Sequence, residues 1–114
     1  MPRERVWDEE ETIILVYEYF NTKGQPLHLI KNKCHEISSF LRKREEFLTG
    51  KSVSEIFRND AGIYMHWCRI RCVDPDTKYN GMKGSDMQIK VFDNFIKDFP
   101  GMKAKAEKIY NKYR

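Results

Sequence analysis

The sequence lacks any apolar run that approaches the roughly 20 residues needed to cross a bilayer. Its opening, MPRERVWDEEE, is acidic where a secretory signal peptide needs an apolar segment. Cysteine is scarce: Cys34, Cys68 and Cys72 are an odd number without the regular spacing of a disulfide framework. We therefore expect reduced thiols in an intracellular, cytoplasmic protein with no membrane partner.

Internal repeats and low-complexity segments are also missing, which excludes solenoid and linker architectures. With 114 residues, 40% of them hydrophobic and 33% charged, the chain has the composition of a folded domain, and we expect one domain over residues 1–114. The formal net charge of +4 and the pI near 9.0 favour a polyanionic partner. A small positive excess is also common among proteins that never meet nucleic acid, so charge alone does not decide the function.

Apolar residues recur at helical spacing along most of the chain. Ser85 with Gln88 has the spacing of a capping box, and so has Ser52 with Glu55, which we expect to open a short helical turn ending at Phe57. The predicted fold class is all-α, a compact bundle. Its expected helices cover residues 8–22, 31–47, 60–73 and 85–99, and a last helix follows Pro100-Gly101.

The apolar positions of these helices predict the core. Trp7, just ahead of the first helix, is expected to fold back on that helix as a hydrophobic staple. The residues expected to face inward outside the central helix are Ile13, Val16, Tyr17, Phe20, Cys34, Ile37, Phe40, Leu41, Phe92, Phe95, Ile96, Phe99, Ala106, Ile109, Tyr110 and Tyr113.

The helix expected over residues 60–73 has two unlike faces. Ile63, Trp67 and Ile70 recur at helical spacing and predict a buried face. The opposite face is expected to be free for a partner and carries Tyr64, Met65, Cys68, Arg69 and Cys72. Aromatic, arginine and small side chains on one exposed face suit insertion into a DNA major groove, so the pattern favours binding over catalysis.

Candidate DNA contacts follow from this placement. We expect Arg58, Asn59, Tyr64, Met65 and Arg69 to contact the duplex. The candidates for phosphate contact are Arg42, Lys43, Arg44, Lys51 and Arg71. Two alternatives stay open: the basic residues near position 43 form a solvated face balanced by neighbouring glutamates, and the lysine-rich C-terminal helix is either a second anchor or a solubilising surface.

The central stretch FRNDAGIYMHWCRIRCVDP resembles a segment of the form FRNxxGIxMKxxNxxxLDP. That segment occurs in a small domain that precedes HNH nuclease domains in bacterial and phage restriction-type endonucleases. Other features sit in the expected order, from Trp7 and the acidic residues after it to the EISSFL helix and the helix containing Phe92 and Phe95. The resemblance therefore covers most of the chain.

This resemblance implies a helix-turn-helix-like DNA-recognition module, normally joined to a nuclease. The positions that match the pattern are Phe57, Arg58, Asn59, Gly62, Ile63, Met65, Asp74 and Pro75. His66 and Arg69 stand where the family has lysine and asparagine. The sequence leaves open whether this is a specificity domain of a longer endonuclease or a free-standing relative.

No catalytic constellation is visible. His28, His35 and His66 lack the ββα setting of an HNH site, and Cys68 and Cys72 lie four apart within one helix without a zinc knuckle. We therefore expect no enzyme activity in this chain, no metal and no cofactor.

Besides double-stranded DNA and an attached nuclease domain, the competing partner is a protein: a small phage or mobile-element regulator would bind a host defence protein through the same face. The basic charge disfavours DNA mimicry.

Overall fold

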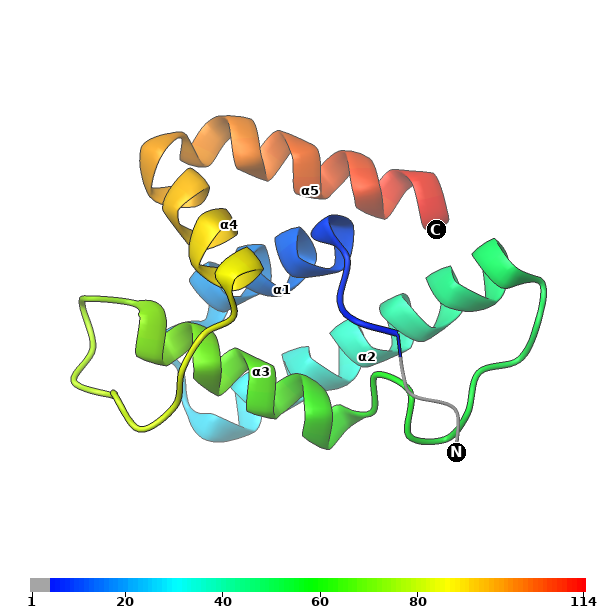
Figure 1. Cartoon of the computed structure of the whole chain (residues 1–114), viewed down its shortest axis with the longest axis horizontal. Coiled ribbons are helices and arrows are strands. Elements are labelled where there is room, and N and C mark those ends of the chain that lie inside the picture. The colour runs from blue at the N-terminus through cyan, green and yellow to red at the C-terminus, as the bar shows by residue number, and fades with distance from the viewer. Residues whose placement is uncertain (1–4) are drawn as a thin grey trace.

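Five helices make up the part of the chain described by the computed structural model, residues 5–114. They are α1 Glu9–Thr22, α2 Leu27–Thr49, α3 Asp60–Val73, α4 Asp86–Lys97 and α5 Phe99–Tyr113. No strand occurs in these residues, so the all-α prediction is confirmed. Figure 1 shows α1 at the centre, with α5 on one side and α2 and α3 on the other, and α1 contacts each of the other four helices.

Helix α1 begins with a reciprocal cap, and its residues 11–16 are all buried. The Glu11 backbone N–H donates to Asp8 Oδ1 at 2.9 Å, and the Asp8 N–H donates to Glu11 Oε1 at 3.0 Å. The predicted stripe correctly includes Ile13 and Val16, but Ile14 and Leu15 are also 0% exposed. A helix surrounded by four others has no solvent face over this stretch, which a one-sided stripe does not anticipate.

Polar groups on α1 hold α3 at its C-terminal end. The Tyr19 hydroxyl donates to Asp74 Oδ2 at 2.6 Å, and Lys23 Nζ donates to the same oxygen at 2.6 Å. Trp67 Nε1 donates to Thr22 Oγ1 at 3.0 Å. Burial alone would raise the pKa of Asp74, but these hydrogen bonds outweigh it and keep the pKa below its usual range.

The N-terminal end of α3 is held to α1 by a buried ion pair. Arg58 Nε lies 2.8 Å from Glu11 Oε2, and Arg5 Nη1 lies 2.7 Å from Glu11 Oε1. Glu11 is 0% exposed, so its charge depends on these two cations. On the other side of α1, the Tyr110 hydroxyl of α5 donates to the buried Glu18 carboxylate at 2.5 Å.

Trp7 differs from its expected role as a staple on its own helix. Its ring packs against the His66 ring of α3, with centroids 4.8 Å apart, and the Arg58 guanidinium lies 4.9 Å from the Trp7 centroid. The tryptophan therefore joins the start of the described chain to α3. The staple expectation considered only residues close in sequence and missed this contact.

The connections depart from the predictions in three places. Helix α2 begins at Leu27 and not at the expected residue 31. It follows a four-residue connection over 23–26 in which Gly24 has φ +80°. The expected helical turn over 52–57 is absent: residues 55–58 form turns, in which the Phe57 N–H donates to the Ser54 carbonyl at 3.2 Å. The α2–α3 connection covers residues 50–59, longer than the three or four residues of a helix-turn-helix unit.

Helix α4 has the predicted capping box of Ser85 and Gln88, but its buried stripe is narrower than expected. Phe92 and Phe95 are buried, whereas Ile96 is 60% exposed because it lies one residue beyond the stripe facing α1. The helix also ends at Lys97, and Asp98 caps the start of α5 by accepting from the Gly101 N–H at 3.1 Å.

Arg58→Ala is expected to lower the free energy of unfolding by about 3–5 kcal/mol, because it removes a partner of the buried Glu11 carboxylate. Urea unfolding followed by circular dichroism measures this loss. The exposed Lys43→Ala is the matched control for removal of one positive charge and should unfold like the wild type. Adding Glu11→Gln to Arg58→Ala should recover part of the loss, since the uncompensated charge is then gone. A loss below about 1 kcal/mol for Arg58→Ala would contradict the assigned role.

Candidate nucleic-acid interface

The outward side of α3 is a narrow stripe at helical spacing, which we call the α3 stripe: Ala61, Met65, Arg69 and Cys72. Ala61 is exposed and Met65 is 41% exposed, while Arg69 and Cys72 are half-buried. The buried face of the helix is the predicted one, with Ile63, Trp67 and Ile70 each at most 1% exposed. Helix α3 therefore has a small free surface between its contacts with α1, α2 and α4.

Arg69 is oriented by the segment that follows α3. Its Nη1 donates to the Lys83 backbone carbonyl at 3.0 Å, which places the guanidinium beside residues 74–85. Arg71 is engaged more closely, because its guanidinium carbon lies 3.6 Å from the Tyr79 ring centroid and its Nη2 lies 3.6 Å from Cys68 Sγ. Arg69 is thus the arginine nearer to the free surface, and Arg71 is covered by an aromatic ring.

Tyr64 and Cys68 contribute less to the free surface than the sequence predicts. Cys68 is only 8% exposed, so the expectation that it faces a partner is wrong. Tyr64 is half-buried and stacks on Trp67 with an interplanar angle of 14°. Burial, and next a hydrogen bond with Cys68, raise the pKa of the Tyr64 hydroxyl. Lys31 of α2 lies with Nζ 5.2 Å from the Tyr64 ring centroid.

Arg44 and Arg58 are in the interior, so neither is available for the DNA contact that the sequence predicts. Arg44 is 4% exposed, and its Nη2 lies 2.9 Å from both Asp8 Oδ2 and Glu10 Oε1. Arg58 is 8% exposed and has φ 48°, a left-handed conformation that turns its side chain toward Glu11. Partners far away in the sequence draw both guanidinium groups inward.

A polar groove lies between α2 and the start of α3, with a volume of about 850 Å³. Arg42 forms part of its wall, and its Nη1 donates to the carbonyls of Ser54 at 2.9 Å and Phe57 at 2.6 Å. This arginine therefore fixes the connection that leads into α3. The residues that line the groove are His35, Ser38, Ser39, Arg42, Lys43, Glu46, Glu55, Asn59, Asp60 and Ala61.

Charges in the groove are mixed. Lys43 is exposed, but the carboxylates of Glu46, Glu55 and Asp60 also line the groove, and Asp60 Oδ2 lies 2.8 Å from His35 Nδ1. Asn59 Oδ1 accepts from the Gly62 N–H at 2.8 Å and so caps α3. The groove is close to neutral, so positive charge alone does not make it a phosphate site.

Two further lysines lie beside the α3 stripe. Lys31 lies next to Tyr64 on the α2 side, and the Lys83 backbone accepts from Arg69 on the other. Both side chains are exposed, as are those of the predicted Lys43 and Lys51. Lys31 carries no local signal in the sequence, because only the packing of α2 against α3 brings it beside Tyr64.

His66 lies at the edge of the core. Its Nδ1 is 3.0 Å from Gln88 Nε2, and its ring packs on Trp7. Burial, together with the positive charges of Arg69 and Arg58, lowers the pKa of His66 from 6.5 to about 4. The side chain is therefore neutral at pH 7 and does not supply a positive charge on α3.

Within residues 5–114 no group of three or more histidine, cysteine or acidic side chains is arranged to hold a metal ion. The helices of the same residues include none with both the length and the apolar character to cross a membrane. Comparisons with protein-family models, with curated proteins and with solved structures found no match to this chain. The class that the fold defines is an all-α bundle with one helix presenting a narrow free stripe.

His66 should make stability fall on acidification. Below pH 6.5 the unfolded chain takes up a proton that the folded chain binds only near pH 4. The free energy of unfolding therefore falls by on the order of 2 kcal/mol between these two pH values. Urea unfolding at pH 7, 5.5 and 4.5 measures the change. His66→Gln should flatten this part of the profile, and the exposed His28→Gln is the matched control that should keep it. A profile that His66→Gln leaves unchanged would argue against the buried neutral imidazole.

Proposed function

We propose that this chain is a non-catalytic module that binds double-stranded DNA, with α3 placed in the major groove. The observation that carries the proposal is the α3 stripe, in which Met65 and Arg69 lie between the small residues Ala61 and Cys72. Small residues let the helix backbone approach a surface closely. The B-DNA major groove is about 12 Å wide and admits one α-helix.

Support also comes from the way α3 is held. Glu11 contacts Arg58 ahead of the helix, and Tyr19 contacts Asp74 at its end, so both ends of α3 are tied to α1. A helix fixed in this way loses little conformational freedom when it binds a partner. Arg58 and Asp74, which match the family pattern, thus serve in this proposal as positioning residues and not as contacts.

Roles for the remaining candidates follow from exposure. Arg69 is the proposed reader of a base edge, because a guanidinium pairs with guanine through two hydrogen bonds. Met65 and Tyr64 would supply apolar contact. The proposed phosphate contacts are the exposed lysines around α3: Lys31, Lys43, Lys51 and Lys83.

The resemblance to the domain that precedes HNH nucleases extends the proposal. In that reading the module supplies sequence specificity to a restriction-type endonuclease whose nuclease part lies outside this chain. The long α2–α3 connection means that the unit is helix-turn-helix-like only in the order and use of its helices.

A protein partner is the second candidate. The near-neutral charge of the α2–α3 groove and the exposed Met65 favour it, since methionine, tyrosine and arginine are enriched in protein interfaces. In this reading the chain is a small phage or mobile-element regulator that binds a defence protein of the host through the α3 stripe.

Selection from a random duplex pool, followed by salt titration, tests the DNA proposal. Wild-type protein should enrich a motif, and Arg69→Ala should lose about 1–3 kcal/mol of preference at one base pair. Lys43→Gln should weaken binding to all sequences and lower the slope of log K against log salt by about 0.9. The exposed Lys90→Gln of α4 is the matched control and should bind like the wild type.

Two results would overturn the assignment. Absence of binding at low salt would remove the DNA proposal and favour the protein partner. Equal enrichment of the same motif by Arg69→Ala and wild type would remove the reading role of Arg69 alone.

A further inference from the structure

The net positive charge of the chain is that of α5 and Arg114. Residues 99–114 contain five basic side chains and one acidic side chain, a net charge of +4, which equals the formal net charge of the whole chain. The first 98 residues therefore contain the other 16 basic and 16 acidic residues and are neutral overall. The excess of positive over negative charge in the sequence therefore equals that of residues 99–114.

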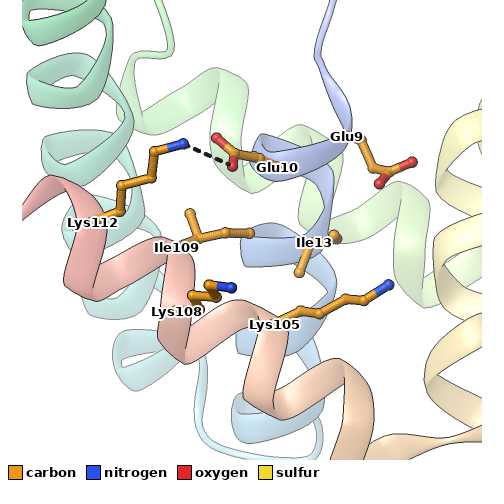
Figure 2. A pocket seen from close by; sticks show the side chains of 7 residues that line it. All are labelled: Glu9, Glu10, Ile13, Lys105, Lys108, Ile109 and Lys112. Atoms are coloured by element: carbon orange, nitrogen blue, oxygen red, sulfur yellow. Dashed lines mark ion pairs between the residues drawn. The ribbon is translucent and has the colours of Figure 1, made fainter.

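Three of these lysines form one row, which we call the α5 lysine row: Lys105, Lys108 and Lys112. They line a hollow of about 290 Å³ between α5 and the start of α1, together with Glu9, Glu10, Ile13 and Ile109. Figure 2 shows the three lysine side chains coming from α5 along one side of the hollow, opposite Glu9 and Glu10 of α1.

The charges in this hollow do not cancel. Glu10 is already paired with the buried Arg44 at 2.9 Å and accepts from the Tyr113 hydroxyl at 3.2 Å, and Lys112 reaches it only at 3.9 Å. Lys105 and Lys108 are exposed and make no ion pair with any residue in the described range 5–114. Glu9 therefore remains as the one carboxylate of the hollow without a paired cation in that range.

We propose that the α5 lysine row binds the phosphate backbone of nucleic acid as a second contact surface, separate from α3. A rise of 1.5 Å per residue spreads the row over about 10 Å of helix axis. That length matches roughly 3 phosphates of one strand at 3.4 Å of duplex axis each. Lysines are flexible point charges that suit backbone contact without base reading.

The surroundings of the row disfavour other anionic partners. Ile13 and Ile109 are 4% and 6% exposed, so the hollow offers no apolar side chain for insertion into a membrane surface. Lysine is depleted from protein–protein interfaces, whereas about half to two-thirds of the hydrogen bonds in protein–DNA interfaces go to phosphate and sugar.

The position of α5 makes the protein bivalent, and this step rests on the proposed function of α3. Helices α3 and α5 both pack on α1 and do not contact each other within residues 5–114. Figure 1 shows them along opposite sides of the molecule, with α1 between them. A straight duplex seated on α3 therefore does not reach the α5 lysine row, and a second duplex segment occupies it.

A bridging assay tests the proposal. Biotinylated duplex is held on beads, and retention of a second, fluorescent duplex is measured with and without the protein. Wild-type protein should retain the second duplex. The triple variant Lys105→Gln, Lys108→Gln and Lys112→Gln should retain at least 10-fold less of the second duplex. The slope of log K for bridging against log salt should be lower by about 2 to 3. The variant should still bind the first duplex.

The matched control is the triple variant Lys90→Gln, Lys97→Gln and Lys103→Gln, which removes the same charge from exposed lysines outside the row. It should bridge like the wild type, and circular dichroism should show all variants folded. Equal loss of bridging in both triple variants would overturn the proposal, because net charge and not the row would then be responsible.

Other outcomes separate this proposal from that for α3. Undiminished bridging by the row variant overturns the proposal for the α5 lysine row and leaves that for α3 standing. In that case two copies of the protein, each bound to one duplex through α3, would account for the bridging. Loss of all duplex binding in the row variant, with Arg69→Ala unaffected, keeps the row as a nucleic-acid site and overturns the role of α3. Absence of duplex binding by the wild type overturns both proposals, and binding of phosphatidylserine vesicles in its place identifies a lipid surface as the anion.

Discussion

Burial of nine of the fourteen residues of α1 is the constraint on which the rest of the structure depends. A polar side chain that is buried on this helix must find a partner inside the protein, or its desolvation is uncompensated. Glu11 finds Arg58, Glu18 finds Tyr110, and Thr22 finds Trp67, so each buried polar group fixes a different neighbour of α1. The apolar surface of α1 makes the bundle compact, and its polar groups determine which helix lies where.

The helices themselves could be predicted from local signals. The capping pair of Ser85 and Gln88 and the spacing of Ile63, Trp67 and Ile70 are short-range patterns, and such patterns place α1, α3 and α4 to within about two residues. The prediction is wrong at the start of α2 and at α5, which begins at Phe99 and includes Pro100 and Gly101 in its first turn. The central position of α1 could not be predicted in this way. Glu11 and Glu18 would indicate a solvated face of the helix from the sequence alone. Their partners, Arg58 and Tyr110, lie 47 and 92 residues away in the sequence.

The same limit applies to the candidate site. Arg44 and Arg58 have the sequence surroundings of surface cations, but ion pairs with α1 and the segment before it draw them inside. Lys31 looks unremarkable in sequence and becomes a neighbour of Tyr64 only through the packing of α2 on α3. Arg69, by contrast, lies on the outward side of α3 that helical spacing predicts, where it is half-buried. Helical spacing predicts on which face of a helix a side chain lies. Contacts with residues far away in the sequence decide whether that side chain is exposed.

Burial of α1 also has a consequence for synthesis. The side of α1 that faces α5 is completed by Tyr110 and Tyr113, which lie 92 and 103 residues beyond their partners Glu18 and Glu10. Chains emerge from the ribosome at about 5–20 residues per second, so this side of α1 stays uncovered for several seconds after the helix itself has left the exit tunnel. During that time the side of Ile13 that faces Ile109 stays exposed, and a ribosome stalled before α5 would hold a chain with an open core.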